Sequence, residues 1–237
     1  MTQALLHGDH HVHSTFSDDA VSTLQENVAA AAAAGLRTVR LVDHVRQSTT
    51  WVPEYLTAVR ALRVPEGLTV LTGVEAKILD ASGGLDIPEL PAGVDRILIA
   101  DHQFPGTDGP LGPTAVRVRI AAGWAPADVL DQLVDALIRV MHRHPGNQLA
   151  HCFSILPKIG LSESELGAER IAAWAQAAAD TGTLVEVNEK WTCPGPEALV
   201  ALRSAGAEIV ASTDAHIASD VGRYERILPL LDAREAH

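Results

Sequence analysis

The sequence near the amino terminus reads Gly8-Asp9-His10-His11-Val12-His13, and near the carboxyl terminus it reads Ser212-Thr213-Asp214-Ala215-His216. Alternate side chains of a β-strand share a face, so a strand here would point His11 and His13 the same way. The same spacing pairs Asp214 with His216. We interpret the two pairs as parts of one metal site.

Single histidines and acids also follow the apolar runs between these two ends of the chain. They occur where each predicted strand ends, which is the edge at which barrel enzymes keep their chemistry. A lone histidine beside an apolar run is usually an ordinary hydrogen-bonded side chain, but recurrence at six strand ends favours a common site. Imidazole and carboxylate ligands suit Zn, Mn or Fe, and the scarcity of cysteine argues against a closed thiolate zinc site. The candidate ligands are His11, His13, Asp18, His44, Glu75, His102, His151, Asp214 and His216.

Strand-like and helical patterns alternate along the chain, which predicts an α/β fold with a parallel sheet and helices outside it. The expected strands after the first are 38–42, 69–74, 96–100, 148–150, 183–187 and 208–211, which makes seven in all. The first expected helix begins at a capping box in 22–25 and ends at Gly35. Four more are expected: one over 53–62, one from Pro126, one from about Glu163 and one over 196–205. No linker or repeat is visible, so a single domain over 1–237 is expected.

The composition limits the functions open to the chain. Its 237 residues are 47% hydrophobic and 20% charged, which is typical of one globular domain. A formal charge of −12 disfavours stable nucleic-acid binding. Cys152 and Cys193 are the two cysteines, which fits a reduced compartment. Neither a leader pattern nor a membrane-spanning run is found, so a cytoplasmic location without membrane contact is expected.

An irregular stretch rich in glycine and proline runs from His102 to Ala125. A loop of this length inside a compact domain is usually functional or disordered. Because it begins at a candidate ligand, we favour a lid or a substrate-contacting loop, with a plain mobile insertion as the alternative. Trp51, Trp124 and Trp191 lie close in sequence to predicted strand ends. They either line a pocket or, as each is more often found, pack at the rim.

The ordered set of motifs resembles the PHP (polymerase and histidinol phosphatase) family from Asp9 to about Gly222. The opening DxHxH is Asp9 to His13, Ser17-Asp18-Asp19 stands for Ser-Asp-Gly, and Ser-x-Asp-Ala-His is Ser212 to His216. The Asp-His pair is Asp43-His44, and Glu75, His102 and His151 match the family's later single ligands. The resemblance implies a distorted (β/α)7 TIM-like barrel. Two departures are Asp19 in place of glycine and Asp101 before His102.

The resemblance further implies two to three divalent metal ions. One would be held by His11, His13, Glu75 and Asp214, a second by Glu75, His102 and His151, and a third by Asp18, His44 and His216. Glu75 and Asp214 are therefore the expected catalytic carboxylates, and clustered metals can deprotonate a bridging water near neutral pH. Asp9, Asp43 and Asp101 either accept from the ligating imidazoles and orient them or, as carboxylates at strand ends, are solvated.

The expected reaction is metal-dependent hydrolysis of a small phosphomonoester, such as histidinol phosphate or a related metabolite. Arg46, Lys190 and Arg223 are the candidate phosphate-binding residues, and Arg223 is preferred because it follows His216 closely. The alternatives are a phosphodiesterase or nuclease on small nucleotides, a C–N hydrolase on the same metals, and a non-catalytic metal-stabilised PHP module. The complete ligand set favours catalysis, and the oligomeric state is left open.

Overall fold

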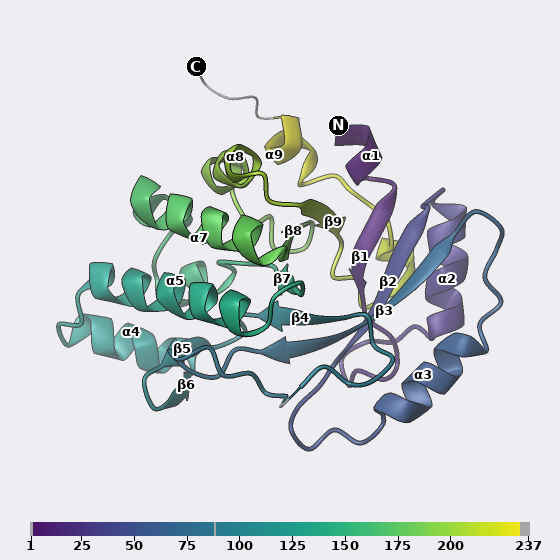
Figure 1. Cartoon of the computed structure of the whole chain (residues 1–237), viewed down its shortest axis with the longest axis horizontal. Helices are drawn as coiled ribbons and strands as arrows, with labels where there is room; N and C mark the ends of the chain where they lie inside the picture. The colour runs from purple at the N-terminus through teal and green to yellow at the C-terminus, as the bar shows by residue number, and fades with distance from the viewer. Residues whose placement is uncertain (1, 88, 233–237) are drawn as a thin grey trace.

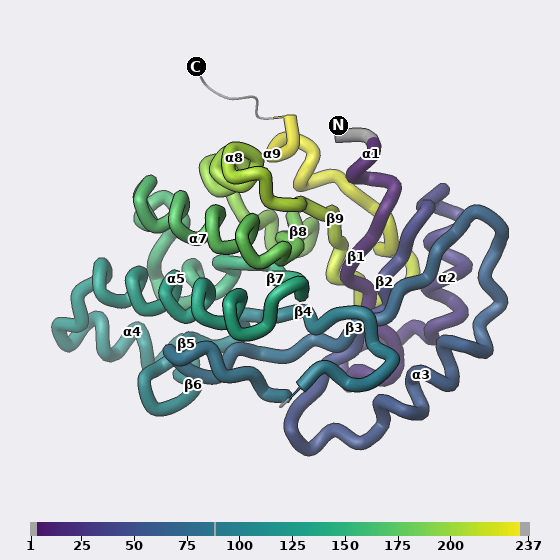
Figure 2. Tube along the Cα trace, in the orientation of Figure 1, coloured from purple at the N-terminus to yellow at the C-terminus, as the bar shows by residue number. Residues whose placement is uncertain are grey.

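The computed structural model describes residues 2–87 and 89–232, so Met1, Pro88 and 233–237 of the expected domain lie outside it. Within these ranges seven parallel strands form one sheet, in the order β1-β2-β3-β4-β7-β8-β9 (Figure 1). The strands are β1 (Gly8–Val12), β2 (Thr38–His44), β3 (Thr69–Lys77), β4 (Arg96–Ala100), β7 (Gln148–Ala150), β8 (Leu184–Asn188) and β9 (Ile209–Ser212). Figure 2 follows the chain round to β9, which lies beside β1, and Val12 bridges to Ala215 in parallel. The sheet is therefore a nearly closed barrel, and the predicted distorted (β/α)7 fold is confirmed.

Helices surround this sheet, and several begin where the sequence placed a start. The capping box is made by Thr23 and Glu26, one residue later than the stretch 22–25 suggested. Near Ser162 the chain makes only a 3-10 turn, and the long helix starts at Gly167. The α-helices are α1 (Thr2–Leu5), α2 (Leu24–Ala33), α3 (Val52–Arg60), α4 (Pro113–Ala121), α5 (Pro126–Arg143), α6 (Ile155–Ile159), α7 (Gly167–Thr181), α8 (Pro196–Ala205) and α9 (Leu228–Asp232). No helix in the described ranges is long and apolar enough to cross a membrane.

The stretch from His102 to Ala125 is ordered, so the expectation of one long irregular loop is wrong. It forms the hairpin of β5 (Phe104–Gly106) and β6 (Gly109–Leu111), followed by α4. Phe104 is fully buried against Trp124, and Gln132 of α5 donates a hydrogen bond to the Pro105 carbonyl at 2.8 Å. The glycines and prolines that suggested a loop instead make a short hairpin anchored on α5.

Asp9 links the first strand of the barrel to the segment that follows the last one. Its buried carboxylate accepts hydrogen bonds from the Thr213 backbone and hydroxyl and from the Gly222 N–H. Burial raises its pKa to about 6 despite these bonds. Its side chain makes no hydrogen bond to an imidazole of the described chain, so its role is to hold β1 against the segment after β9. The expectation that it orients a ligating histidine is wrong.

Candidate metal centre

The carboxyl ends of the strands bring histidines and acids from the whole chain into one cluster. His11 and His13, at the end of β1, place their Nε2 atoms 2.9 Å apart. Asp214, just after β9, lies with Oδ1 at 3.2 Å from His13 Nε2 and 3.8 Å from His11 Nε2. All three side chains are buried. Ligand atoms of this trio lie close enough together to hold one metal ion.

Glu75, near the end of β3, lies at the centre of the cluster. Its Oε1 is 3.0 Å from His151 Nε2 and 3.1 Å from His102 Nε2. Its Oε2 is 2.8 Å from His44 Nδ1 and 3.3 Å from His13 Nε2. The two oxygens therefore face different groups of imidazoles, which is the arrangement that a carboxylate bridging two cations needs.

Protein acceptors outside the cluster hold three of the imidazoles in one orientation. Glu186 lies 3.1 Å from His11 Nδ1, and a carboxylate can only accept, so Nδ1 carries a proton and Nε2 is the nitrogen left for a metal ion. Ser17 Oγ lies 3.2 Å from His13 Nδ1 and donates its own proton to Asp43 at 2.7 Å. The hydroxyl is thus left to accept from His13 Nδ1, and Nε2 of that ring is the nitrogen left for a metal ion.

His151 is held in the same way on the other side of Glu75. Its Nδ1 lies 3.2 Å from Ser154 Oγ, which donates to Asp101 at 2.8 Å. Asp101 and Asp43 therefore act on imidazoles through serine hydroxyls. The Nε2 atoms of His11, His13 and His151 all face the cluster.

Imidazole nitrogens and carboxylate oxygens thus meet in one buried space. Glu75 Oε2 is buried and accepts no hydrogen bond in the described structure. Burial alone lowers the pKa of His151, but Asp101 and Glu75 raise it to about 10. Positive charge must therefore enter this cluster, as protons or as metal ions, and the donor set of imidazole and carboxylate fits divalent Zn, Mn or Fe.

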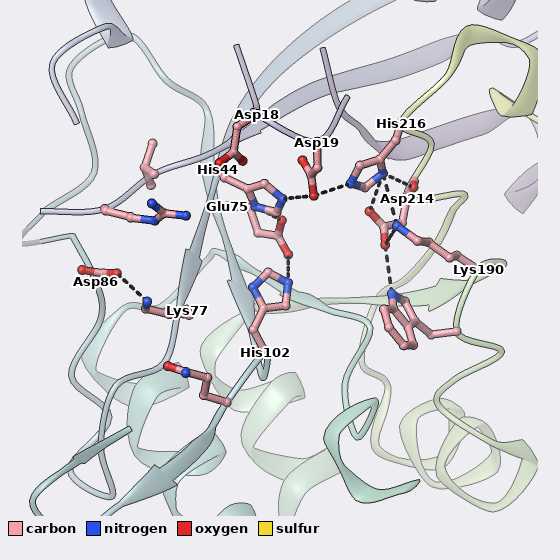
Figure 3. A pocket seen from close by; sticks show the side chains of 14 residues that line it. Asp18, Asp19, His44, Glu75, Lys77, Asp86, His102, Lys190, Asp214 and His216 are labelled. Atoms are coloured by element: carbon pink, nitrogen blue, oxygen red, sulfur yellow. Dashed lines mark hydrogen bonds and ion pairs between the residues drawn. The ribbon is translucent and has the colours of Figure 1, made fainter. Parts of the chain in front are cut away.

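The third group of ligands differs from the expectation at one position (Figure 3). Asp19 Oδ2 lies 3.5 Å from His44 Nε2 and 3.3 Å from His216 Nε2, while Asp18 forms no ion pair with a histidine of the described chain. The turn after β1 is fixed by the buried Ser17. Asp18 and Asp19 are both exposed, and the Asp19 carboxylate is turned toward the two imidazoles. Asp18 also lines the cavity with these histidines, so its role as their fellow ligand stays a prediction, while the observed contacts favour Asp19.

The cluster opens into a cavity of about 400 Å³. Arg46, Lys190 and Trp191 line it together with a Lys77–Asp86 ion pair of 3.2 Å (Figure 3). Lys190 Nζ lies 3.2 Å from Asp214 Oδ2, so one cation already stands beside the candidate ligands.

The two other tryptophans considered from the sequence lie elsewhere. Trp51 packs on Phe16 and Tyr55, and Trp124 packs on Phe104. Both are packing residues, whereas Trp191 lines the cavity.

Comparison with known proteins agrees with this geometry. The family model of the PHP domain matches residues 9–190. The chain belongs to the PHP domain family. A probable phosphatase of Acetivibrio thermocellus is 30% identical over 94% of this chain and 85% of that protein. A probable phosphatase of Edwardsiella ictaluri is 27% identical over 94% of this chain and 84% of that protein. A crystal structure of histidinol phosphate phosphatase from Lactococcus lactis, complexed with Zn, L-histidinol and phosphate, superposes with a TM-score of 0.64 at 18% identity, over 89% of this chain and 86% of that one.

Arg223 lies outside the cavity of this PHP domain. It lines a neighbouring recess and pairs with Glu225 at 3.2 Å, and both side chains are exposed. Six residues separate it from His216, among them a 3-10 turn, Ala218–Asp220. The recess shares Lys190, Asp214 and His216 with the cavity. The preference for Arg223 over Lys190 and Arg46 is thus not supported by where the three residues lie.

Glu186 is the residue of this PHP domain that sequence reasoning missed. It is fully buried and accepts from His11, from the His151 N–H at 2.6 Å, from Gln148 at 2.9 Å and from Asn188 at 2.8 Å. The available signal was a charged residue inside the apolar run Leu184-Val185-Glu186-Val187. Such a residue is rarely buried without partners, so it pointed to a polar contact within the barrel.

Proposed function

We propose that this chain is a metal-dependent phosphoesterase that hydrolyses a small phosphomonoester. The observation that carries the proposal is Glu75, whose two buried oxygens face separate groups of imidazoles. The names of the relatives as probable phosphatases support the reaction, and the phosphate and zinc named with the Lactococcus lactis structure support the chemistry.

The candidate ligands divide into three groups around Glu75. His11, His13 and Asp214 would hold one cation with Glu75, and His102 and His151 would hold a second with Glu75. His44 and His216 would hold a third, with Asp19 in place of Asp18. Bound divalent cations supply Lewis acidity to a phosphoryl oxygen and activate water near neutral pH.

The chain's own residues would bind and orient the ester. Lys190 stands beside Asp214 on a flexible stem, so its ammonium can reach a phosphoryl oxygen placed at the cluster. Arg46 lies on the cavity wall and offers a planar guanidinium. We propose Lys190 for the phosphoryl group and Arg46 for the rest of the substrate. The cavity of about 400 Å³ suits a small metabolite.

Release of inorganic phosphate from a panel of phosphorylated metabolites tests the proposal. The wild-type protein, loaded with Zn, Mn or Fe in turn, is expected to hydrolyse a monoester, with histidinol phosphate the first to try. Glu75→Gln keeps the shape but removes the charge that two cations share, so turnover should fall by at least about a hundredfold. Glu208→Gln, an exposed carboxylate before β9, is the matched control.

Nucleotide diesters and C–N substrates belong in the same panel because the fold and metals do not fix the scissile bond. Hydrolysis of those substrates alone would replace the monoesterase proposal. Loaded protein that hydrolyses nothing in the panel would favour a non-catalytic metal-stabilised module.

A further inference from the structure

Trp191 lies in a tight turn that follows β8 directly. Its backbone N–H donates to Asn188 Oδ1 at 3.0 Å, and the Asn188 N–H donates to the Cys193 carbonyl at 2.8 Å. Asn188 also donates to the buried Glu186. The turn is thus fastened to the end of the barrel, which fixes where the indole can lie.

The indole contacts a candidate metal ligand through its only polar atom. Trp191 Nε1 donates to Asp214 Oδ2 at 2.9 Å, while Oδ1 of the same carboxylate faces His13 and His11. Lys158 Nζ lies 3.9 Å from the centre of the indole ring, so a cation–π contact holds the ring as well. The two oxygens of Asp214 therefore have separate tasks.

Asp214 needs such an anchor. Its backbone has φ of 55°, in the left-handed region, so neither a regular strand nor a helix holds its side chain. A carboxylate attached there can rotate about its own bonds unless a donor holds one oxygen. Lys190 also contacts Oδ2, but its side chain is 43% exposed and its stem is flexible. The partly buried indole is the rigid donor.

We infer that Trp191 is a positioning residue for the metal site: its indole N–H fixes the Asp214 carboxylate so that Oδ1 faces the His11–His13 pair. This inference rests on the proposed function, because it takes Asp214 to be a metal ligand. Trp191, on the cavity wall, would thus support a metal ligand by a hydrogen bond in addition to packing.

Trp191→Phe tests the inference because it keeps an aromatic ring and removes the N–H. Zinc dissociation constants are measured by chelator competition on the metal-free full-length chain. Trp191→Phe should weaken the binding of one zinc ion roughly tenfold or more, with the Tm of the metal-free protein near that of the wild type. Trp124→Phe, which alters a ring packed on Phe104, should leave the zinc affinity unchanged.

A second measurement uses the wild-type protein and does not depend on the variant folding. In protein labelled with ¹⁵N at the indole nitrogens, zinc should shift the Trp191 Nε1–H resonance and leave that of Trp124 in place. Equal zinc affinities for Trp191→Phe and the wild type, or an indole resonance that zinc does not move, would overturn the inference alone. Wild-type protein that binds no zinc would overturn the proposed function and the inference with it.

Discussion

Replacing Glu186 by glutamine should weaken metal binding although Glu186 touches no metal. Four donors converge on its two oxygens: His11 Nδ1, the His151 N–H, and the side-chain amides of Gln148 and Asn188. Glutamine keeps one oxygen and places an NH₂ group against the donors at the other. In either orientation at least one buried donor loses its partner.

The cost can be worked from these contacts. A buried donor left unpaired costs about 1–3 kcal/mol, and removal of a carboxylate behind a ligating histidine lowers metal affinity about 10- to 100-fold. Since a factor of ten corresponds to about 1.4 kcal/mol, the two figures agree. The loss should fall on the cation held by His11, because the bond at 3.1 Å fixes which nitrogen of that ring is free.

The assay is zinc affinity by chelator competition, with thermal unfolding of the metal-free protein measured alongside. Glu186→Gln is compared with Glu208→Gln, which makes the same chemical change at an exposed position. We expect a 10- to 100-fold rise in one zinc dissociation constant for Glu186→Gln and none for Glu208→Gln. A zinc affinity within about twofold of the wild type would refute the reasoning that Glu186 orients His11.

Three further predictions follow from where individual side chains lie. Asp19→Asn should abolish the binding of one metal ion or raise its dissociation constant at least about tenfold, measured by chelator competition, and Asp18→Asn should have a much smaller effect. A larger effect for Asp18→Asn would show that Asp18 is the ligand. Lys190→Ala should raise KM for the best phosphomonoester roughly 10- to 100-fold in a steady-state assay, because it removes a charged hydrogen bond of about 1.5–3 kcal/mol. Arg223→Ala should leave KM unchanged in the same assay. Burial raises the pKa of Glu163 from 4.5 to about 7, so the native state binds this proton more tightly than the unfolded chain and loses stability as the pH rises from about 4.5 to 7. Glu163→Gln should therefore be more stable than the wild type at pH 8, by on the order of 1–3 kcal/mol in urea unfolding, and equal to it at pH 4; a difference that does not depend on pH would contradict this.

The fold could be predicted from the sequence because the apolar strands and their polar ends recur in order. His11, Glu75 and Asp214 each follow or end a strand, and parallel strands bring such positions to one edge. The stretch from His102 to Ala125 could not be predicted. Its prolines and glycines are the signals of a loop, and only the packing of Phe104 under α5 makes them a hairpin.

The sequence predicted which strand ends contribute to the site, but not which residue within a turn faces it. Asp18 and Asp19 are neighbours in a turn, where no periodicity decides which side chain faces inward, and the hydrogen bonds of Ser17 settle it. Glu186 was hidden because three of its partners lie far from it in the sequence, His11 in β1 and Gln148 and His151 in and just after β7. Trp191 was visible as a residue near a strand end, but its bond to Asp214 depends on the turn after β8.

The most direct test of the account is the number of transition-metal ions bound per chain, measured by elemental analysis of the full-length protein after loading and removal of free metal. The convergence of imidazole nitrogens and carboxylates on Glu75 predicts two to three ions per chain for the wild type. Glu75→Gln should bind at least about one ion fewer. A wild-type chain that retains no ion would contradict it, because the buried cluster would then be neutralised by protons alone.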